Sequence, residues 1–504
     1  MFKRVLIANR GEIAVRIIRA LKEAGIASIA IYSDADRESR HVRFADEAYR
    51  IGPSPSEESY LKIDSIVSLA RKVKADAVHP GYGFLAENEA FAEACEARRI
   101  VFIGPSSKAI RTMGNKLVAR RAAMAVKAPI IPGATTATKS LADAKKRARQ
   151  IGYPVMLKAA AGGGGKGMRV VCEEKELESA LRLTKGEARA AFGDDEVYVE
   201  KYINRPRHIE FQILADTHGN CVYLGERECS IQRRHQKVIE ETPSVIMTPE
   251  LRREMGEAAV RITKRVGYTN AGTVEFIVDE RRDFYFLEMN TRLQVEHPVT
   301  ELVTGIDIVR EQLAIAAGRK LAIKQEDVRP RGHAIECRIY AEDPYNHFLP
   351  SAGRIMRLRI PEGPGIRNDT GIFEGWDVSV YYDPLLAKLI VWGKDRKEAI
   401  ERAQRALSEY LIEGIATTIP FHKWILRQPA FHKGEIDATF IDRKFSSAVP
   451  EHRPGYEEAA IIAAALDVFQ TSRKVFIPGA NKASARSSAW RLQGRLRGPV
   501  ERRG

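Results

Sequence analysis

Polar groups occupy every even position from 288 to 296 of one stretch near the middle of the chain, Glu288-Met289-Asn290-Thr291-Arg292-Leu293-Gln294-Val295-Glu296-His297-Pro298. In an extended backbone those five side chains share one face of the strand. No packing argument asks for two carboxylates, a guanidinium and two amides on one face of a segment that follows the apolar run Phe284–Leu287. Charge alternation is usually a solvated strand face, but here we favour a functional site.

An upstream segment is expected to pair with this stretch as a β-hairpin. Residues 272–278 have the pattern of a strand, and the polar residues 279–283 that of a turn. The hairpin would bring Glu275 beside Glu288, and carboxylates that close repel each other unless a cation lies between them. Hard oxygen ligands suit Mg²⁺ or Mn²⁺ shared with substrate phosphates, so we predict a metal site formed by Glu275, Glu288 and Asn290.

A glycine-rich loop offers the phosphate site that such a metal needs. Four consecutive glycines, 162–165, precede Lys166 and lie between strand-like runs at 153–157 and 168–171. Glycines leave backbone N–H groups free to point at anionic oxygens. The loop is not a Walker A loop, and alone it could equally be a flexible hairpin tip. Lys116, at the start of a predicted helix, opposes the helix dipole unless an anion lies nearby, which favours nucleotide binding.

Five motifs, in this order, resemble those of biotin carboxylases, which belong to the ATP-grasp superfamily. They span residues 7–14, 79–85, 158–168, 228–237 and 288–298. The resemblance implies an α/β fold: a parallel-sheet, Rossmann-like N-terminal domain, a two-lobed ATP-grasp domain and a C-terminal α+β domain. Alternating strand and helix signals through about residue 112 independently favour the parallel sheet. The expected boundaries are 1–112, 113–330 (with a lid at about 131–203), 331–445 and a basic extension, 446–504.

The resemblance also implies a reaction and its residues. MgATP or MnATP would phosphorylate bicarbonate to carboxyphosphate, and the carboxyl group would then pass to N1 of biotin. Arg292, Lys237, Glu296 and Arg338 would be catalytic, with Glu296 as general base and Arg338 stabilising the biotin enolate. The positions implied to contact ATP, bicarbonate or biotin are Tyr82, Lys116, Lys158, Gly163, Gly164, Gly165, Lys166, Gly167, Met168, Glu200, Lys201, Ile203, His208, Gln232, His235, Gln294 and Val295.

The chain shows neither a Met-Lys-Met biotin-attachment sequence nor room for a carboxyltransferase domain. We therefore expect it to act on biotin borne by a partner, a biotin carboxyl carrier or carboxyltransferase subunit. Family likeness suggests a homodimer. The extension past residue 445 resembles that of separate biotin carboxylase subunits of pyruvate carboxylases; an acetyl-CoA or propionyl-CoA carboxylase is the alternative. Residues 457–470 have an apolar stripe with helical spacing, and Trp490 follows, so we hypothesise that this tail docks the partner subunit. The alternative is a disordered, solvated tail.

Composition and charge limit the remaining alternatives. Five scattered cysteines, with neither a signal peptide nor a membrane-spanning apolar run, predict a cytoplasmic protein. The net charge is +15, but residues 471–504 carry nine Lys or Arg against one Glu, so a basic tail dominates and nucleic-acid binding is disfavoured. A carbamoyl-phosphate synthetase fragment would also phosphorylate bicarbonate; the lack of internal duplication and the motifs around Lys237 and Arg338 oppose it.

Overall fold

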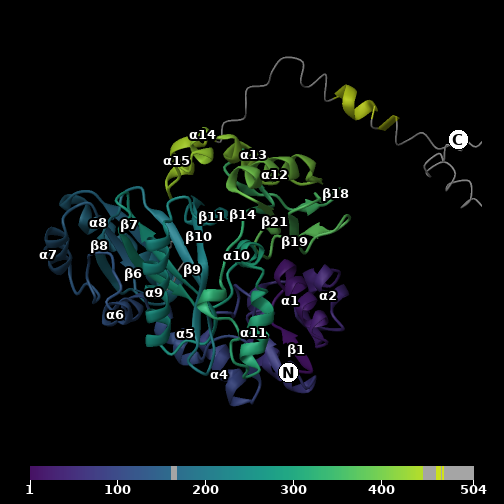
Figure 1. The fold of residues 1–504 in the computed structure, drawn as a ribbon, viewed down its shortest axis with the longest axis horizontal. Coiled ribbons are helices and arrows are strands. Elements are labelled where there is room, and N and C mark those ends of the chain that lie inside the picture. The colour runs from purple at the N-terminus through teal and green to yellow at the C-terminus, as the bar shows by residue number, and fades with distance from the viewer. Residues whose placement is uncertain (161–166, 447–460, 467, 470–504) are drawn as a thin grey trace, which may run out of the picture. The chain divides into compact units, whose positions relative to one another are not determined.

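The computed structural model describes residues 1–160, 167–446, 461–466 and 468–469. The chain divides into two compact units, Met1–Ser447 and Ala448–Gly504. The first unit begins with a parallel sheet of order β3-β2-β1-β4-β5. Figure 1 labels its strand β1, close to the N-terminus. Its strands are β1 (Arg4–Ile7), β2 (Ala27–Ser33), β3 (Glu47–Gly52), β4 (Ala77–His79) and β5 (Val101–Phe102). The predicted parallel sheet is therefore confirmed.

Helices cover both faces of this sheet because successive residues of β1 point to opposite sides. Val5 and Ile7 pack with α1 (Gly11–Glu23), whereas Leu6 packs with α3 (Ile63–Lys72) and α4 (Glu89–Ala97). Ala14, Ile17, Ile18 and Leu21, which recur at a helical period, lie on the buried side of α1. Two-sided burial explains why residues 5–7 of β1 are all apolar.

A second sheet forms the centre of the unit and is antiparallel throughout, with eight strands in the order β13-β12-β9-β10-β11-β14-β21-β19. The strands are β9 (Arg207–Ala215), β10 (Cys221–Arg233), β11 (Gln236–Thr242), β12 (Asn270–Val278), β13 (Phe284–Asn290), β14 (His333–Tyr340), β19 (Ile366–Thr370) and β21 (Leu385–Gly393). Because β11 pairs with β14, hydrogen bonding continues across the boundary predicted at residue 330, and that boundary stays a prediction.

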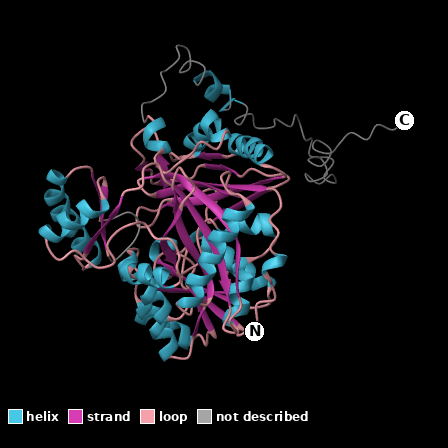
Figure 2. Ribbon diagram, turned by 60° about the vertical axis from the view of Figure 1, so that its left-hand side comes forward, coloured by secondary structure: helices cyan, strands magenta, loops and turns pink. Residues whose placement is uncertain are grey.

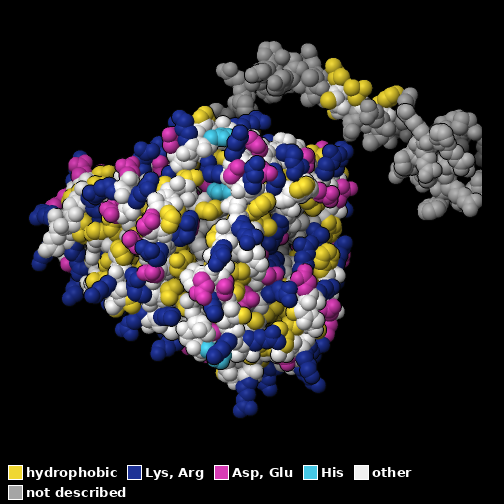
Figure 3. Space-filling view, viewed as in Figure 1, with side chains coloured by type: hydrophobic (Ala, Val, Ile, Leu, Met, Phe, Trp, Pro, Cys, Tyr) yellow, Lys and Arg dark blue, Asp and Glu magenta, His cyan; other side chains and the backbone are white. Residues whose placement is uncertain are grey.

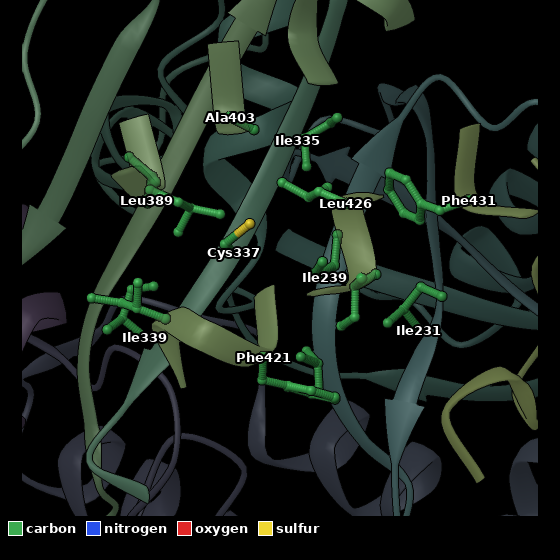
Figure 4. Close-up of a cluster of buried hydrophobic side chains, with 14 of the residues drawn as sticks. Ile231, Ile239, Ile335, Cys337, Ile339, Leu389, Ala403, Phe421, Leu426 and Phe431 are labelled. Atoms are coloured by element: carbon green, nitrogen blue, oxygen red, sulfur yellow. The ribbon is translucent and has the colours of Figure 1, made fainter. Parts of the chain in front are cut away.

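One face of this sheet at β14 is apolar and the other is charged. Ile335, Cys337 and Ile339 pack beneath α12 (Arg396–Glu409), α13 (Ile419–Arg427) and α14 (Pro429–His432), as Figure 4 shows for part of the cluster. The alternate residues Glu336 and Arg338 point to the other side and are also buried. Buried charges need partners, so the second face is where a site is expected.

A smaller antiparallel sheet, β7-β6-β8, joins β6 (Val155–Ala159), β7 (Met168–Val171) and β8 (Val197–Lys201). With α7 (Leu141–Ile151) and α8 (Leu177–Phe192) it forms a separate group of elements, seen at the left of Figure 2. Its core includes Val155, Leu157 and Ala148. This group contains the glycine-rich loop, whose residues 161–166 lie outside the described part of the chain.

In the second unit, residues 461–466 are helical, with Ile461, Ile462 and Leu466 exposed. The rest of the predicted helix 457–470, apart from 468 and 469, and Trp490 lie outside the described residues. Within the described residues, no helix has the length and apolar character to cross a membrane. On the face in Figure 3, basic and acidic side chains are interspersed.

Candidate active site

The predicted β-hairpin forms and places two carboxylates opposite each other. Glu275 of β12 and Glu288 of β13 are register partners, so both side chains lie on one face of the sheet. The Asn290 amide donates a hydrogen bond to Glu275 Oε1 at 2.8 Å. The three groups predicted as metal ligands are therefore neighbours.

The extended face predicted for residues 288–296 is wrong beyond Asn290, where β13 ends. The chain turns there because the Glu87 carboxylate accepts hydrogen bonds from the Thr291 N–H at 2.9 Å and from Arg292 Nε at 2.8 Å. Pro298 then sits in the first turn of α10 (His297–Thr304), a position that favours helix initiation.

The polar groups of this segment converge in spite of the turn. Arg292 donates to Asn290 Oδ1 at 3.1 Å and to Gln294 Oε1 at 2.9 Å. Gln294 in turn donates to Glu275 Oε1 at 3.1 Å. A loop thus gathers side chains that the sequence analysis placed along a strand.

Lys237 of β11 connects this cluster to the rest of the sheet. Its Nζ donates to Glu210 at 2.5 Å, Glu275 at 2.9 Å and Glu296 at 2.7 Å. Burial opposes the charged ammonium, but the three carboxylates outweigh it and raise the pKa of Lys237 well above its usual value. Lys237 is therefore a permanent cation at the centre of the site.

Glu296, the N-cap residue of α10, is fully buried between two cations. Lys237 holds one carboxylate oxygen, and Arg338 Nη2 donates to the other at 2.8 Å. Burial would raise the pKa of Glu296, but Lys237, Arg338 and Arg227 outweigh it and hold this pKa well below its usual value. Glu296 is ionised at neutral pH, and its capacity as a base depends on position more than on basicity.

His208 of β9 lies on the same face, between Gln232 and the metal-type carboxylates. Gln232 Nε2 lies 2.8 Å from His208 Nδ1, and His208 Nε2 lies 2.8 Å from Glu275 Oε2. Burial disfavours the imidazolium, yet Glu275 outweighs it and raises the pKa of His208. His208, Glu210 and Glu275 also have ligand atoms within 4.8 Å of one another.

The predicted grouping and the grouping around His208 could each hold a cation, and electrostatics favours the predicted one. Glu210 pairs with Arg227 and Lys237, and Glu275 pairs with Lys237, whereas Glu288 has no hydrogen bond or ion pair to any described residue. Burial raises the pKa of Glu288, and the opposing effect of Lys116, although larger than the further rise from Glu275, does not cancel the effect of burial. A divalent cation at Glu275, Glu288 and Asn290 would supply the missing charge with oxygen ligands of the type Mg²⁺ and Mn²⁺ prefer.

Several of the predicted nucleotide contacts lie on or beside the strands of the smaller sheet. Lys116 is the first residue of α6 (Lys116–Ala125), as predicted, and the Lys158 ammonium pairs with the Glu200 carboxylate across β6 and β8. Lys201 donates to the Gly152 carbonyl at 2.9 Å, so its ammonium binds the chain itself. Ile203 is half-buried.

The loop itself is described only at its end. Gly167 has φ +67°, and a Cβ there would lie 2.9 Å from that of Ala159, so glycine is required. Met168 begins β7. The predicted contacts Gly163, Gly164, Gly165 and Lys166 lie outside the described residues.

Lys388 of β21, which the sequence analysis missed, joins the remaining predicted positions. Its Nζ donates to the Val295 carbonyl at 2.8 Å and lies 5.7 Å from the centre of the Tyr82 ring. Lys388 is also the register partner of Arg338, so the structure brings Tyr82, Val295 and Arg338 to the same side of the sheet.

His235 lies on the tight turn between β10 and β11, with φ +66°. Its partial burial lowers its pKa, and the nearby Lys158 lowers it further.

Three family sequence profiles match the chain in succession. They are "Biotin carboxylase, N-terminal domain" at residues 1–110, "Carbamoyl-phosphate synthase L chain, ATP binding domain" at 115–324 and "Biotin carboxylase C-terminal domain" at 336–443. The middle profile carries the name of the rival interpretation, but both flanking profiles are those of biotin carboxylase.

Known proteins agree with this order. The chain is 51% identical to a pyruvate carboxylase subunit of Methanothermobacter thermautotrophicus over 97% of this chain and 98% of that one. It is 53% identical to biotin carboxylase 1 of Bacillus subtilis, over 88% and 98%. The biotin carboxylase domain dimer of Hydrogenobacter thermophilus 2-oxoglutarate carboxylase, solved with MgADP, ADP and bicarbonate, matches with TM-score 0.86 and 49% identity over 88% and 98%. The chain belongs to the biotin carboxylase family of ATP-dependent ligases.

Proposed function

We propose that this chain uses ATP and a divalent metal to activate bicarbonate and carboxylates biotin carried by a partner subunit. The observation that carries the proposal is the position of Glu296, whose two oxygens are held by Lys237 and Arg338 beside the metal-type carboxylates. That arrangement offers a base and two cations to a small anion, next to a place for the nucleotide's metal. A bound Mg²⁺ or Mn²⁺ would supply charge neutralisation at the transferred phosphoryl group.

The chain's own groups have distinct tasks in this scheme. Lys237 and Arg292 bind the bicarbonate anion together with Gln294 and the Val295 N–H. Glu296 accepts the bicarbonate proton, and proximity compensates for its low basicity. Lys116, Lys158, His235 and the glycine-rich loop would bind the nucleotide phosphates, with Glu200, Lys201, Ile203, His208 and Gln232 completing the nucleotide site.

Biotin carboxylation requires a separate cation. Loss of the N1 proton places negative charge on the ureido oxygen of biotin, and Arg338 is the guanidinium that would stabilise it. Tyr82 would contact the biotin ring. We infer that the chain acts as a homodimer on biotin held by a carrier or carboxyltransferase subunit; a relative's solved domain is a dimer.

The final acceptor is proposed to be pyruvate. The match with the Methanothermobacter pyruvate carboxylase subunit extends over 97% of the chain, including most of the extension past residue 445. Relatives of about 50% identity also include propionyl-CoA carboxylase alpha chains, so a CoA thioester is the second candidate. Co-purification of the biotinylated partner, followed by carboxylation assays with pyruvate and with acyl-CoA substrates, distinguishes the two.

The reaction itself is tested with the purified chain. Phosphate release from MgATP should depend on bicarbonate and rise when free biotin is added. Glu296→Gln should abolish the bicarbonate dependence, whereas Glu301→Gln, a buried glutamate of the same helix paired with Arg16 and Arg367, should preserve it. Rapid ATP turnover that ignores bicarbonate would contradict the proposal.

A further inference from the structure

Two buried carboxyl groups adjoin the site, and the reaction described above gives them no task. Glu240 of β11 and Glu336 of β14 are register partners, and neither side chain is exposed to solvent. Arg338 Nε donates to Glu240 Oε1 at 2.6 Å. Among the described residues, none donates a hydrogen bond to the other oxygen of Glu240 or to either oxygen of Glu336.

Lys388, the cation with the strongest effect on Glu336, makes its hydrogen bond and ion pair with other groups. Lys388 Nζ donates to the Val295 carbonyl at 2.8 Å and pairs with Glu12 at 3.2 Å. The elements packed around the pair also contribute titratable groups near it. These include Arg227 and Cys229 of β10, Lys237 of β11, Arg338 and Tyr340 of β14, Asp369 of β19, Lys388 of β21, Glu296 and His297 of α10, and Glu12 of α1.

Two carboxylates that face each other in a dry sheet cannot both stay charged without enough donors. One proton between them removes a charge and provides the missing donor. Burial raises the pKa of Glu240 to about 7, because burial and the nearby Glu296 together outweigh the opposing effect of Arg338. Burial also raises the pKa of Glu336 well above its usual value. The next residue, Glu241, faces the other way; His333 and Arg396 outweigh its burial and lower its pKa to about 2. The raised pKa values of Glu240 and Glu336 thus contrast with the lowered one on the opposite face of the sheet.

We propose that Glu240 and Glu336 share one proton and form a positioning pair that limits the negative charge competing with biotin for Arg338. With the shared proton, the pair carries one negative charge, and Arg338 is divided between Glu240 and Glu296. Without it, a second negative charge on the same face draws the guanidinium away from the substrate. The functional part of this inference rests on the proposed role of Arg338; the shared proton does not.

Infrared spectroscopy of the free protein tests the proton directly. Wild type at neutral pH should show a protonated-carboxyl C=O band that is lost in Glu336→Gln, because the amide introduced at position 336 then donates to an ionised Glu240. Glu240→Gln should lose the same band, which provides a second variant if the first folds poorly. Glu241→Gln, which replaces an ionised carboxylate of the same strand, should keep it. An unchanged band in both test variants would mean that both carboxylates are ionised and bridged by water, and would overturn the proposal.

The pH profile tests the consequence for catalysis. Biotin-dependent turnover of the wild type should fall on the alkaline side as the pair loses its proton. Glu336→Gln holds the charge of the pair at one, so its alkaline limb should move up by about one pH unit or more. Lower turnover with an unmoved limb would indicate a merely structural role and reject the positioning role. If the infrared band is present in the wild type and lost in both test variants, but neither the wild type nor any variant carboxylates biotin, the proposed function is rejected and the shared proton is retained.

Discussion

Arg338→Gln should separate the two half-reactions. The guanidinium donates to Glu240 at 2.6 Å and to Glu296 at 2.8 Å, on the side of Glu296 opposite Lys237. Removing it takes the cation from the biotin step. Lys237 still holds Glu296 at 2.7 Å, so a cation remains for bicarbonate.

The structure sets the size of two opposing effects. Loss of one oriented charged donor in a water-excluded site costs about 2.7–4 kcal/mol of transition-state stabilisation, or about 10²–10³-fold in rate. Breaking a buried ion pair costs about 3–5 kcal/mol of folding stability, and here Glu240 loses its only hydrogen-bonding cation among the described residues. Rates must therefore be compared at temperatures far below the unfolding transition. Arg338→Lys retains the charge without the two-pronged geometry and serves as the matched control.

The assay measures both steps on one preparation. Bicarbonate-dependent phosphate release is followed without biotin, and carboxybiotin formation is followed with free biotin and labelled bicarbonate. For Arg338→Gln, the second rate should fall by about 10²–10³-fold and the first by far less. Equal losses in both rates would refute the assignment of Arg338 to the biotin step.

Four further outcomes are expected. Arg292→Ala should lower phosphate release and carboxybiotin formation together, because Arg292 contacts Asn290 and Gln294; a selective loss would contradict this. Glu288→Gln should weaken Mn²⁺ binding, measured by calorimetry, with little change in melting temperature, whereas Glu275→Gln should lower both because it leaves Lys237 and His208 short of a partner. Burial would raise the pKa of Asp36, but Arg10 outweighs burial and lowers this pKa from 3.8 to about 2. The ion pair therefore stabilises the fold by about 2 kcal/mol above pH 3.8, and this stabilisation is lost as the pH falls towards 2. The difference in melting temperature between wild type and Asp36→Asn should disappear over that pH range. Truncation after Ser447 should leave activity with free biotin intact and weaken activity with the carrier-bound cofactor, and equal carrier binding by both chains in calorimetry would reject docking by the tail.

Much of the site was predictable because its chemistry is concentrated in short motifs. The pairing of Glu275 with Glu288 followed from two strand patterns and a polar turn. The path of residues 291–296 did not, since it depends on Glu87, which lies about 200 positions earlier in the chain. Arg227 was missed for a similar reason: it is fully buried against Glu210, Gln212, Thr273 and Thr300, and only the assembled sheet and α10 bring these together. Lys388 lies in an apolar run that indicates a core strand.

The two faces of the central sheet explain why site and fold are inseparable in this chain. Ile335, Cys337 and Ile339 enter the apolar core on one face, and that burial specifies the register of β14. The same register places Glu336 and Arg338 on the other face, opposite Glu240 and Lys388. A slip of one residue would exchange the faces, burying charges in the core and removing the guanidinium from Glu296. Apolar packing on one side therefore positions charged groups on the other to within hydrogen-bonding distance, and core variants of β14 should impair biotin carboxylation before they unfold the protein.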